Sequence, residues 1–203
     1  MQNFVMGIAG AVLFAAGVVV GTGVQDGKKP SEQDAKKPAA EQDAAAPAVK
    51  PTAEHAVLAR EAGVWAFKQK MLDPSNGQWA ESTGTETIKM DCGGLWSCAE
   101  FDCTGGVNKG FRGRGITGFD PAKKQYVGMW VDSTTASPFV LVGAYDAAKK
   151  QLVMDALGTD PNGNEIRLKM TTTTVDEKNR RFAVSMDQGG KDFEIMTIEY
   201  VKS

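Results

Sequence analysis

The stretch Ile166-Arg167-Leu168-Lys169-Met170 alternates apolar and basic side chains without a break. Phe182, Val184 and Met186 repeat the period of two in the next apolar run. Such alternation is typical of a strand with one face buried and the other in water. A helix would need apolar residues three and four positions apart. The stretch therefore favours an antiparallel sheet in this part of the chain.

The same period extends over most of the chain. About ten strands are expected, joined by hairpin-length turns that contain Gly, Pro, Asp and Asn. They cover residues 64–72, 83–91, 95–103, 110–119, 125–133, 138–145, 151–157, 165–175, 181–187 and 192–201. One short helix is expected before them, over Thr52–Ala62, with Thr52 as its N-cap.

Ten consecutive strands in about 150 residues must pack on themselves, as a barrel or as a two-sheet sandwich. Closure into a barrel removes the unpaired strand edges. The sequence therefore predicts an all-β fold, an antiparallel up-and-down β-barrel of about ten strands behind one short N-terminal helix. A barrel of this size has room for one small ligand.

Residues 1–25 contain no charged side chain, and Phe4–Val24 is apolar except for Thr22. About 20 such residues span the hydrocarbon core of a bilayer. A secretory signal has a shorter apolar run behind a basic start, and no basic residue precedes this one. We expect a transmembrane anchor that contacts the membrane through residues 4–24, with a cleaved signal segment as the alternative.

The orientation of this anchor is open. Lys28 and Lys29 follow the run, which favours a cytoplasmic domain. An exported domain behind an N-terminal anchor is the commoner arrangement, so we expect the domain outside the cytoplasm. The protein is then membrane-anchored, or secreted if the segment is cleaved.

Residues 26–51 have low complexity and carry five Lys against five acidic residues. Lys28–Ala35 is repeated, with small changes, as Lys36–Ala44. A segment with so few large apolar side chains cannot offset the entropy lost on ordering. We expect a disordered linker here and a single domain over residues 52–203.

Composition excludes several classes of function. The 203 residues are 42% hydrophobic and 24% charged, with a net charge of -2. This charge argues against a nucleic-acid partner, since such proteins carry a basic excess or stripe. His55 is the single histidine, which argues strongly against Ser-His-Asp catalysis and against a metal site with several histidines. We expect it at the helix end or in solvent, and we expect no metal and no cofactor.

Cys92, Cys98 and Cys103 show no metal-binding CxxC spacing. Cys98 and Cys103 are five apart on one expected strand, so they point to opposite faces. We expect all three to be small buried hydrophobic residues rather than disulfide partners.

Gly113-Arg114-Gly115-Ile116-Thr117-Gly118 matches the GxGxxG string of nucleotide-binding proteins. That function requires the glycines to open a helix after a strand, and here they lie within a strand pattern. A bend or bulge in a barrel strand is the preferred interpretation.

A possible ligand site lies near the middle of the chain. Tyr126, Trp130 and Asp132 share one strand face, with Ser133 beside them, and would line a pocket if that face is inward. An outward face would be a solvated strand, and period two leaves both open. Arg112 and Arg114 share a face that would meet either an anionic ligand or water. The candidate ligand-binding residues are Trp65, Arg112, Arg114, Tyr126, Trp130, Asp132, Ser133 and Glu194.

Gly63-Val64-Trp65, at the start of the first expected strand, resembles the G-x-W of the lipocalin and fatty-acid-binding (calycin) group. The wider pattern resembles a bacterial family, the domain of unknown function 1579, over residues 52–203. The matching stretches include Ser82–Thr87, Gly93–Trp96, Gly118–Lys123, Tyr126–Gly128, Trp130–Ser133 and Gly143–Asp146. The resemblance implies a calycin-like barrel and no catalytic residues. Phe119 stands where the family pattern has Tyr.

Two classes of function follow. The first is non-enzymatic binding of a small apolar or amphipathic ligand, favoured by the seven Met residues of the domain. The second is a structural or protein-interaction domain whose interior is filled by its own side chains. An enzyme with a carboxylate-based site, such as Asp132 with Glu194, is a third possibility. The oligomeric state is not indicated.

Overall fold

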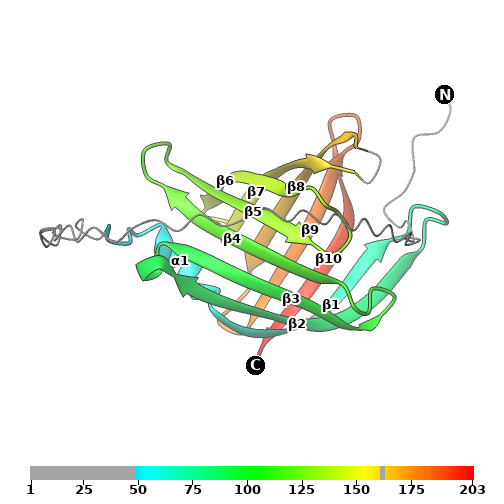
Figure 1. Cartoon of the computed structure of the whole chain (residues 1–203), viewed down its shortest axis with the longest axis horizontal. Coiled ribbons are helices and arrows are strands. Elements are labelled where there is room, and N and C mark those ends of the chain that lie inside the picture. The colour runs from blue at the N-terminus through cyan, green and yellow to red at the C-terminus, as the bar shows by residue number, and fades with distance from the viewer. Residues whose placement is uncertain (1–48, 161–162) are drawn as a thin grey trace, which may run out of the picture. The chain divides into compact units, whose positions relative to one another are not determined.

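Ten antiparallel strands follow one short helix in the computed structural model, which describes residues 49–160 and 163–203 (Figure 1). The elements are α1 (His55–Arg60), β1 (Gly63–Leu72), β2 (Trp79–Asp91), the 3-10 turn η1 (Cys92–Gly94), β3 (Trp96–Gly106), β4 (Arg112–Asp120), β5 (Gln125–Asp132), β6 (Phe139–Asp146), β7 (Gln151–Thr159), β8 (Glu165–Thr174), β9 (Asn179–Asp187) and β10 (Asp192–Lys202). The predicted anchor, and the predicted linker up to residue 48, lie outside the described residues. No helix in the described ranges is long and apolar enough to cross a membrane.

The strands form a closed barrel. Each strand pairs with its neighbours in sequence, and β1 pairs with β10 to complete the ring. In the closing pair Phe67 lies opposite Tyr200, and the register runs without a shift from Trp65 to Met71. The predicted up-and-down barrel is therefore confirmed, and the sandwich is excluded.

The helix differs from the prediction. It covers His55–Arg60 only, and the Thr52 side chain does not cap it. Instead the Thr52 hydroxyl donates to Glu54 Oε2 at 2.6 Å, and the Thr52 backbone N–H donates to His55 Nδ1 at 2.9 Å. His55 begins the helix, as one of the two predicted alternatives has it, whereas the solvated alternative is wrong, because the residue is 4% exposed and its ring packs edge-on against Phe119.

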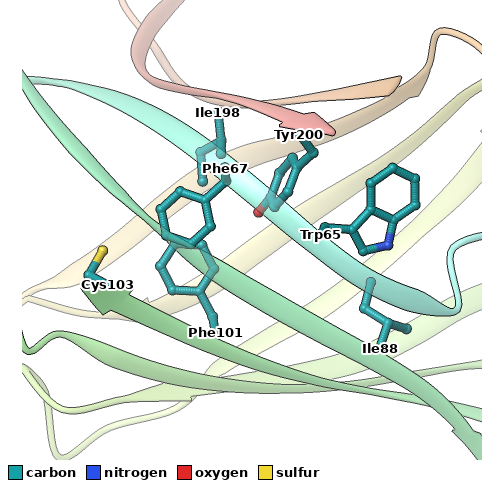
Figure 2. Packing of buried hydrophobic residues seen from close by; sticks show 7 residues of the cluster. All are labelled: Trp65, Phe67, Ile88, Phe101, Cys103, Ile198 and Tyr200. Carbon is teal, nitrogen blue, oxygen red and sulfur yellow. The ribbon is translucent and has the colours of Figure 1, made fainter. Parts of the chain in front are cut away.

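Two clusters of apolar side chains pack inside the barrel. The first contains Trp65, Phe67, Ile88, Phe101, Cys103, Ile198 and Tyr200 (Figure 2). At its centre the rings of Phe67 and Phe101 stack with centroids 4.2 Å apart. The second contains Leu58, Tyr126, Leu141, Met154 and Ala156. Trp130 packs against both clusters and joins them.

The GxGxxG string has a different cause from the one predicted. Strand β4 pairs with β3 and β5 without a register shift, so these glycines form no bulge. A Cβ atom on Gly113 would lie 2.0 Å from the Trp130 ring, and one on Gly115 would lie 3.2 Å from it. Gly118 faces outward, where a Cβ would lie 2.6 Å from the Trp96 ring. Each glycine is therefore required because an indole ring lies against the strand.

The cysteines match the prediction in part. All three are free in the structure. Cys103 is buried in the barrel while Cys98 is half-buried on the outer face, as the alternation predicts. Cys92 is exposed, because it lies in the turn η1 rather than in a strand.

Replacement of Gly113 by Ala is expected to lower the free energy of unfolding by about 2–3 kcal/mol, since the new methyl group overlaps an indole ring that the interior cannot release. Gly118→Ala is the matched control, because the Trp96 ring lies on the outer face, apart from both apolar clusters, and can move. Its expected cost is under about 1 kcal/mol. Urea titration of both variants checks this, and equal losses would contradict it.

Candidate functional site

Helix α1 covers one end of the barrel, which we call the helix end. Trp65 Nε1 donates to the Glu61 backbone carbonyl at 2.9 Å, and the Tyr126 hydroxyl donates to the Glu54 carbonyl at 3.0 Å. Leu58 inserts into the second apolar cluster. The turns β2–β3, β4–β5, β6–β7 and β8–β9 lie at this end, because successive strands run in opposite directions. The opposite end is called the far end.

A buried ion cluster lies at the helix end, under α1. Arg180 of β9 is 5% exposed, and its Nη1 contacts Glu61 Oε2 at 3.0 Å. Its Nη2 contacts Glu86 of β2. The Glu61 carboxylate also accepts a bond from Thr174 Oγ1 at 3.2 Å. The Arg180 guanidinium thus links β9 to Glu61, the residue after α1, and to β2, which lies beyond β10 and β1 in the ring.

Aromatic rings enclose the same guanidinium. Its Cζ lies 4.0 Å from the centre of the Tyr200 ring and 4.5 Å from that of Trp65. Figure 2 shows these two rings side by side at the end of the first apolar cluster. Lys202 Nζ lies 5.0 Å from the Trp65 ring. Cation–π contact of this kind favours a desolvated arginine.

The cluster is asymmetric in charge, because Arg180 faces two carboxylates. Burial raises the pKa of the Glu86 carboxyl, and the Arg180 charge, shared with Glu61, offsets this only in part. Burial also raises the pKa of the Tyr200 hydroxyl, with the nearby Glu86 adding to the effect. Arg180 Nε is buried without a hydrogen-bond partner in the described chain. The contacts of Arg180 with Glu61 and Glu86 hold α1 on the barrel, although burial of these charges costs desolvation energy.

A different surface lines the interior away from this cluster. Leu168 and Met170 of β8 face inward, as do Phe182 of β9 and Met196 of β10, since each packs against one of the two apolar clusters. All four side chains are nevertheless only half-buried. Side chains that point into the ring and still meet solvent are not fully packed by their neighbours. We call these four residues the inner wall.

Four of the eight predicted site residues face the interior, but they form no single site. Trp65 and Tyr126 are buried at the helix end. Trp130 and Asp132 lie on the same inward face of β5, toward the far end, where Trp130 Nε1 donates to Asp132 Oδ2 at 3.0 Å. The inward alternative for this strand is therefore the one the structure shows. Ser133 lies at the strand end, and its hydroxyl accepts a bond from the Arg112 backbone N–H at 3.1 Å.

The other predicted residues face outward. Arg112 and Arg114 contact Asp102 on the neighbouring strand at 3.8 Å each, so they form a surface stripe. Glu194 pairs with Arg181 at 2.7 Å on the outer face of β9 and β10. It lies outside the barrel wall and Asp132 inside it, so the two do not form a carboxylate pair.

Sequence reasoning missed Glu61, Glu86 and Arg180. A signal for two of them was present in the alternation. Arg180 lies two residues before Phe182, in phase with the apolar face of its strand. Glu86 lies two residues before Ile88 in the same way. A charged residue in phase with a buried face needs an opposite charge from another strand, and this expectation would have paired them.

The outer wall has two hollows. One, of about 360 Å³, is bordered by Thr87, Lys89, Met90, Asp91, Cys98 and Glu100. The other, of about 660 Å³, lies over β6, β7 and β8 and includes Val140, Val142, Leu157 and Lys169. In the described residues no group of three His, Cys, Asp or Glu side chains is arranged to hold a metal ion.

These features define a class of protein, a closed antiparallel β-barrel with a buried ion cluster at one end. The family model described as "Protein of unknown function (DUF1579)" matches residues 50–202, and the chain belongs to this family. No curated protein matches the chain. Among solved structures, a redesigned β-barrel is similar at 11% identity and a TM-score of 0.37, over 72% of this chain and 95% of that one.

Replacement of Glu86 by Gln is expected to change how stability depends on pH. A raised folded-state pKa means that the folded protein binds this proton more tightly than the unfolded chain does. The stability of the wild-type protein relative to Glu86→Gln should therefore fall as pH rises above the ordinary value of 4.5. Urea titrations between pH 4 and pH 8 measure this difference.

Glu100→Gln is the control, because it removes an exposed carboxyl of the outer face that has no contact with Arg180. A difference for Glu86→Gln that grows with pH would show that attraction to Arg180 outweighs burial, and would contradict the prediction.

Proposed function

We propose that the barrel binds one small apolar or amphipathic molecule in its calycin-like interior, and that residues 4–24 hold the domain at a membrane. The half-buried state of the inner wall carries the first part of this proposal. Leu168, Met170, Phe182 and Met196 face inward and remain partly accessible. Apolar side chains around a space that water can enter would be stabilised by an apolar ligand.

The chemistry of the inner wall suits a ligand of variable shape. Met170 and Met196 are unbranched and polarizable, so they adjust to irregular partners. Leu168 and Phe182 have fewer rotatable bonds and add apolar surface whose shape changes less from one ligand to another. Because no cation is present among these four residues, the binding energy would come from apolar contact.

Charges in the interior favour an uncharged ligand. Arg180 is the one cation among the buried residues of the described chain, and its guanidinium already faces Glu61 and Glu86. Asp132 faces the interior toward the far end. A carboxylate ligand would therefore meet the negative charge of Asp132 at the far end, and at the helix end an arginine that is already paired.

A filled barrel that acts through its outer surface is the second candidate function. The hollow of about 660 Å³ over β6, β7 and β8 favours it, because exposed Val140, Val142 and Leu157 border that hollow. Apolar side chains gathered on an outer wall are typical of contact surfaces. The two candidates differ in which face of the sheet a partner touches.

Replacement of Met170 by Trp is expected to abolish ligand binding by filling the interior. Native mass spectrometry of the full-length protein, titrated with 1-dodecanol, should show one bound molecule per wild-type chain. The variant should lose at least about tenfold in affinity, the effect of about 1.4 kcal/mol. Thr171→Trp, one residue along on the outer face, is the control and should bind as the wild type does.

Binding to neither protein would contradict the ligand proposal and leave the outer-surface function. Equal binding to the wild type and to Met170→Trp would place the probe outside the barrel.

Dodecanoate is expected to bind at least about tenfold more weakly than 1-dodecanol at pH 7.5, since its carboxylate must lose water and would meet the inward-facing Asp132 at the far end. Asp132→Asn should reduce this preference, because it removes one inward-facing negative charge. Isothermal titration of both ligands into both proteins checks the prediction. A tighter complex with dodecanoate would contradict it.

A further inference from the structure

Two turns at the helix end have the same sequence pattern. Asp120-Pro121-Ala122-Lys123-Lys124 joins β4 to β5, and Asp146-Ala147-Ala148-Lys149-Lys150 joins β6 to β7. Strand β5 pairs with β6, so the two turns are neighbours on one rim of the barrel. We call their four lysines the lysine rim.

The turns also share their construction. Asp120 Oδ1 accepts bonds from the backbone N–H groups of Ala122 and Lys123, at 2.9 and 3.1 Å. Asp146 Oδ1 accepts the equivalent bonds at 3.0 and 3.1 Å. Each aspartate thus stabilises its own turn, and the turns hold their lysines at equivalent positions.

The last lysine of each turn has an unfavourable backbone conformation. Lys124 has a φ of 54° and Lys150 a φ of 53°. This left-handed region favours Gly, Asn or Asp over a residue with a long side chain. Turn geometry alone therefore does not explain lysine at either position. Strain of this kind, repeated in two turns, points to a role for the side chain.

The lysine rim carries a net positive charge. Lys123, Lys124, Lys149 and Lys150 are all exposed. Against these four stand only the two aspartates, which lie 4.0 Å from Lys123 Nζ and 3.6 Å from Lys149 Nζ. Of the other two turns at this end, Asp176-Glu177-Lys178 is net negative and the β2–β3 turn carries Asp91 and no basic residue, so the positive surface is limited to the side of β4–β7.

The described chain begins at the same end of the barrel. Pro51 lies against Gly94 of η1, where a Cβ on the glycine would be 3.1 Å from the proline Cγ. Residues 4–24, the apolar run proposed to enter a membrane, precede this point in sequence. A membrane that holds this run is thus connected to the barrel through the end that carries the lysine rim.

We propose that the lysine rim rests on a bilayer rich in anionic phospholipid, with the helix end of the barrel toward the membrane. This inference rests on the membrane-tether part of the proposed function. Each lysine near an anionic surface adds to the attraction, which decays within a Debye length. Four lysines against two aspartates bind weakly alone, but a tether raises the effective concentration enough for weak attraction to set the orientation.

The test measures how fast each lysine is acetylated by an N-hydroxysuccinimide ester. The full-length chain is reconstituted into vesicles of phosphatidylcholine alone, or of phosphatidylcholine with 30% phosphatidylglycerol. Mass spectrometry gives the rate at each lysine. We expect the lysine rim to react at least about threefold more slowly in anionic vesicles at low salt, and 0.5 M NaCl to remove the difference.

A double variant separates charge from fold stability. Lys124→Gly with Lys150→Gly removes two charges and relieves both unfavourable backbone conformations, so its thermal midpoint should rise. Protection of the remaining Lys123 and Lys149 should fall to less than half. Lys109→Gln with Lys191→Gln, from two turns at the far end, is the matched control and should leave that protection unchanged.

Each outcome decides the proposal. Equal acetylation in both vesicle types, or equal protection of Lys109 and Lys191, would overturn it while leaving the tether intact. A chain that floats with anionic vesicles only, and leaves them in high salt, would support attraction between the lysine rim and anionic lipid. It would contradict insertion of residues 4–24 into the membrane. A chain that floats with neither would overturn both.

Discussion

Pairing between β1 and β10 is the constraint on which the rest of this structure depends. It joins strands separated by more than 100 positions in sequence, and it converts a row of hairpins into a ring without edges. Because the ring is closed, every strand has one inward and one outward face. The period of two in the sequence then decides which side chains meet inside. A shift of β10 by one residue in this register would turn Tyr200 to solvent while Phe67 stays inside.

Filling the ring requires large and small side chains at opposed positions. Phe67 of β1 and Phe101 of β3 stack over β2, where Gly84 has no side chain, and the Trp130 ring lies on the glycines at positions 113 and 115 of the neighbouring strand. A wide aromatic ring on one strand is thus matched by the absence of a side chain on the next. The same relation explains why glycines are frequent inside a sheet, where they would otherwise weaken a strand.

Alternation and turn chemistry were sufficient to predict the strands, their order and their antiparallel pairing. Strand β8 shows why, since each of Ile166, Leu168 and Met170 is flanked by polar or basic neighbours. The same local signal could not separate inside from outside for every strand. Arg112 and Arg114 share a face, and only the pairing with Asp102 on β3 shows that this face is outward.

The ion cluster was beyond local reasoning for a related reason. Glu61, Glu86 and Arg180 are far apart in sequence. The alternation places Glu86 and Arg180 on inward faces, but only closure of the ring shows that these charges meet each other and Glu61. The prediction of a solvated His55 failed similarly, because burial of its ring depends on Phe119 from β4. The position of a residue in the alternation of its strand can be read from nearby sequence. The residue that pairs with a buried charge cannot, because it comes from a distant part of the chain.

The two ends of the barrel differ in what they require. At the helix end the buried Arg180 pairs with two carboxylates, and removal of its guanidinium would leave Glu61 and Glu86 buried without an opposite charge. That end is therefore specified by electrostatics and closed by α1. The inner wall of Leu168, Met170, Phe182 and Met196 has no such requirement, since apolar contacts are not directional and tolerate exchange. Residues of the inner wall can therefore be exchanged for other apolar residues, which changes the ligands that the interior accepts. The ion cluster and the closed ring of strands stay the same.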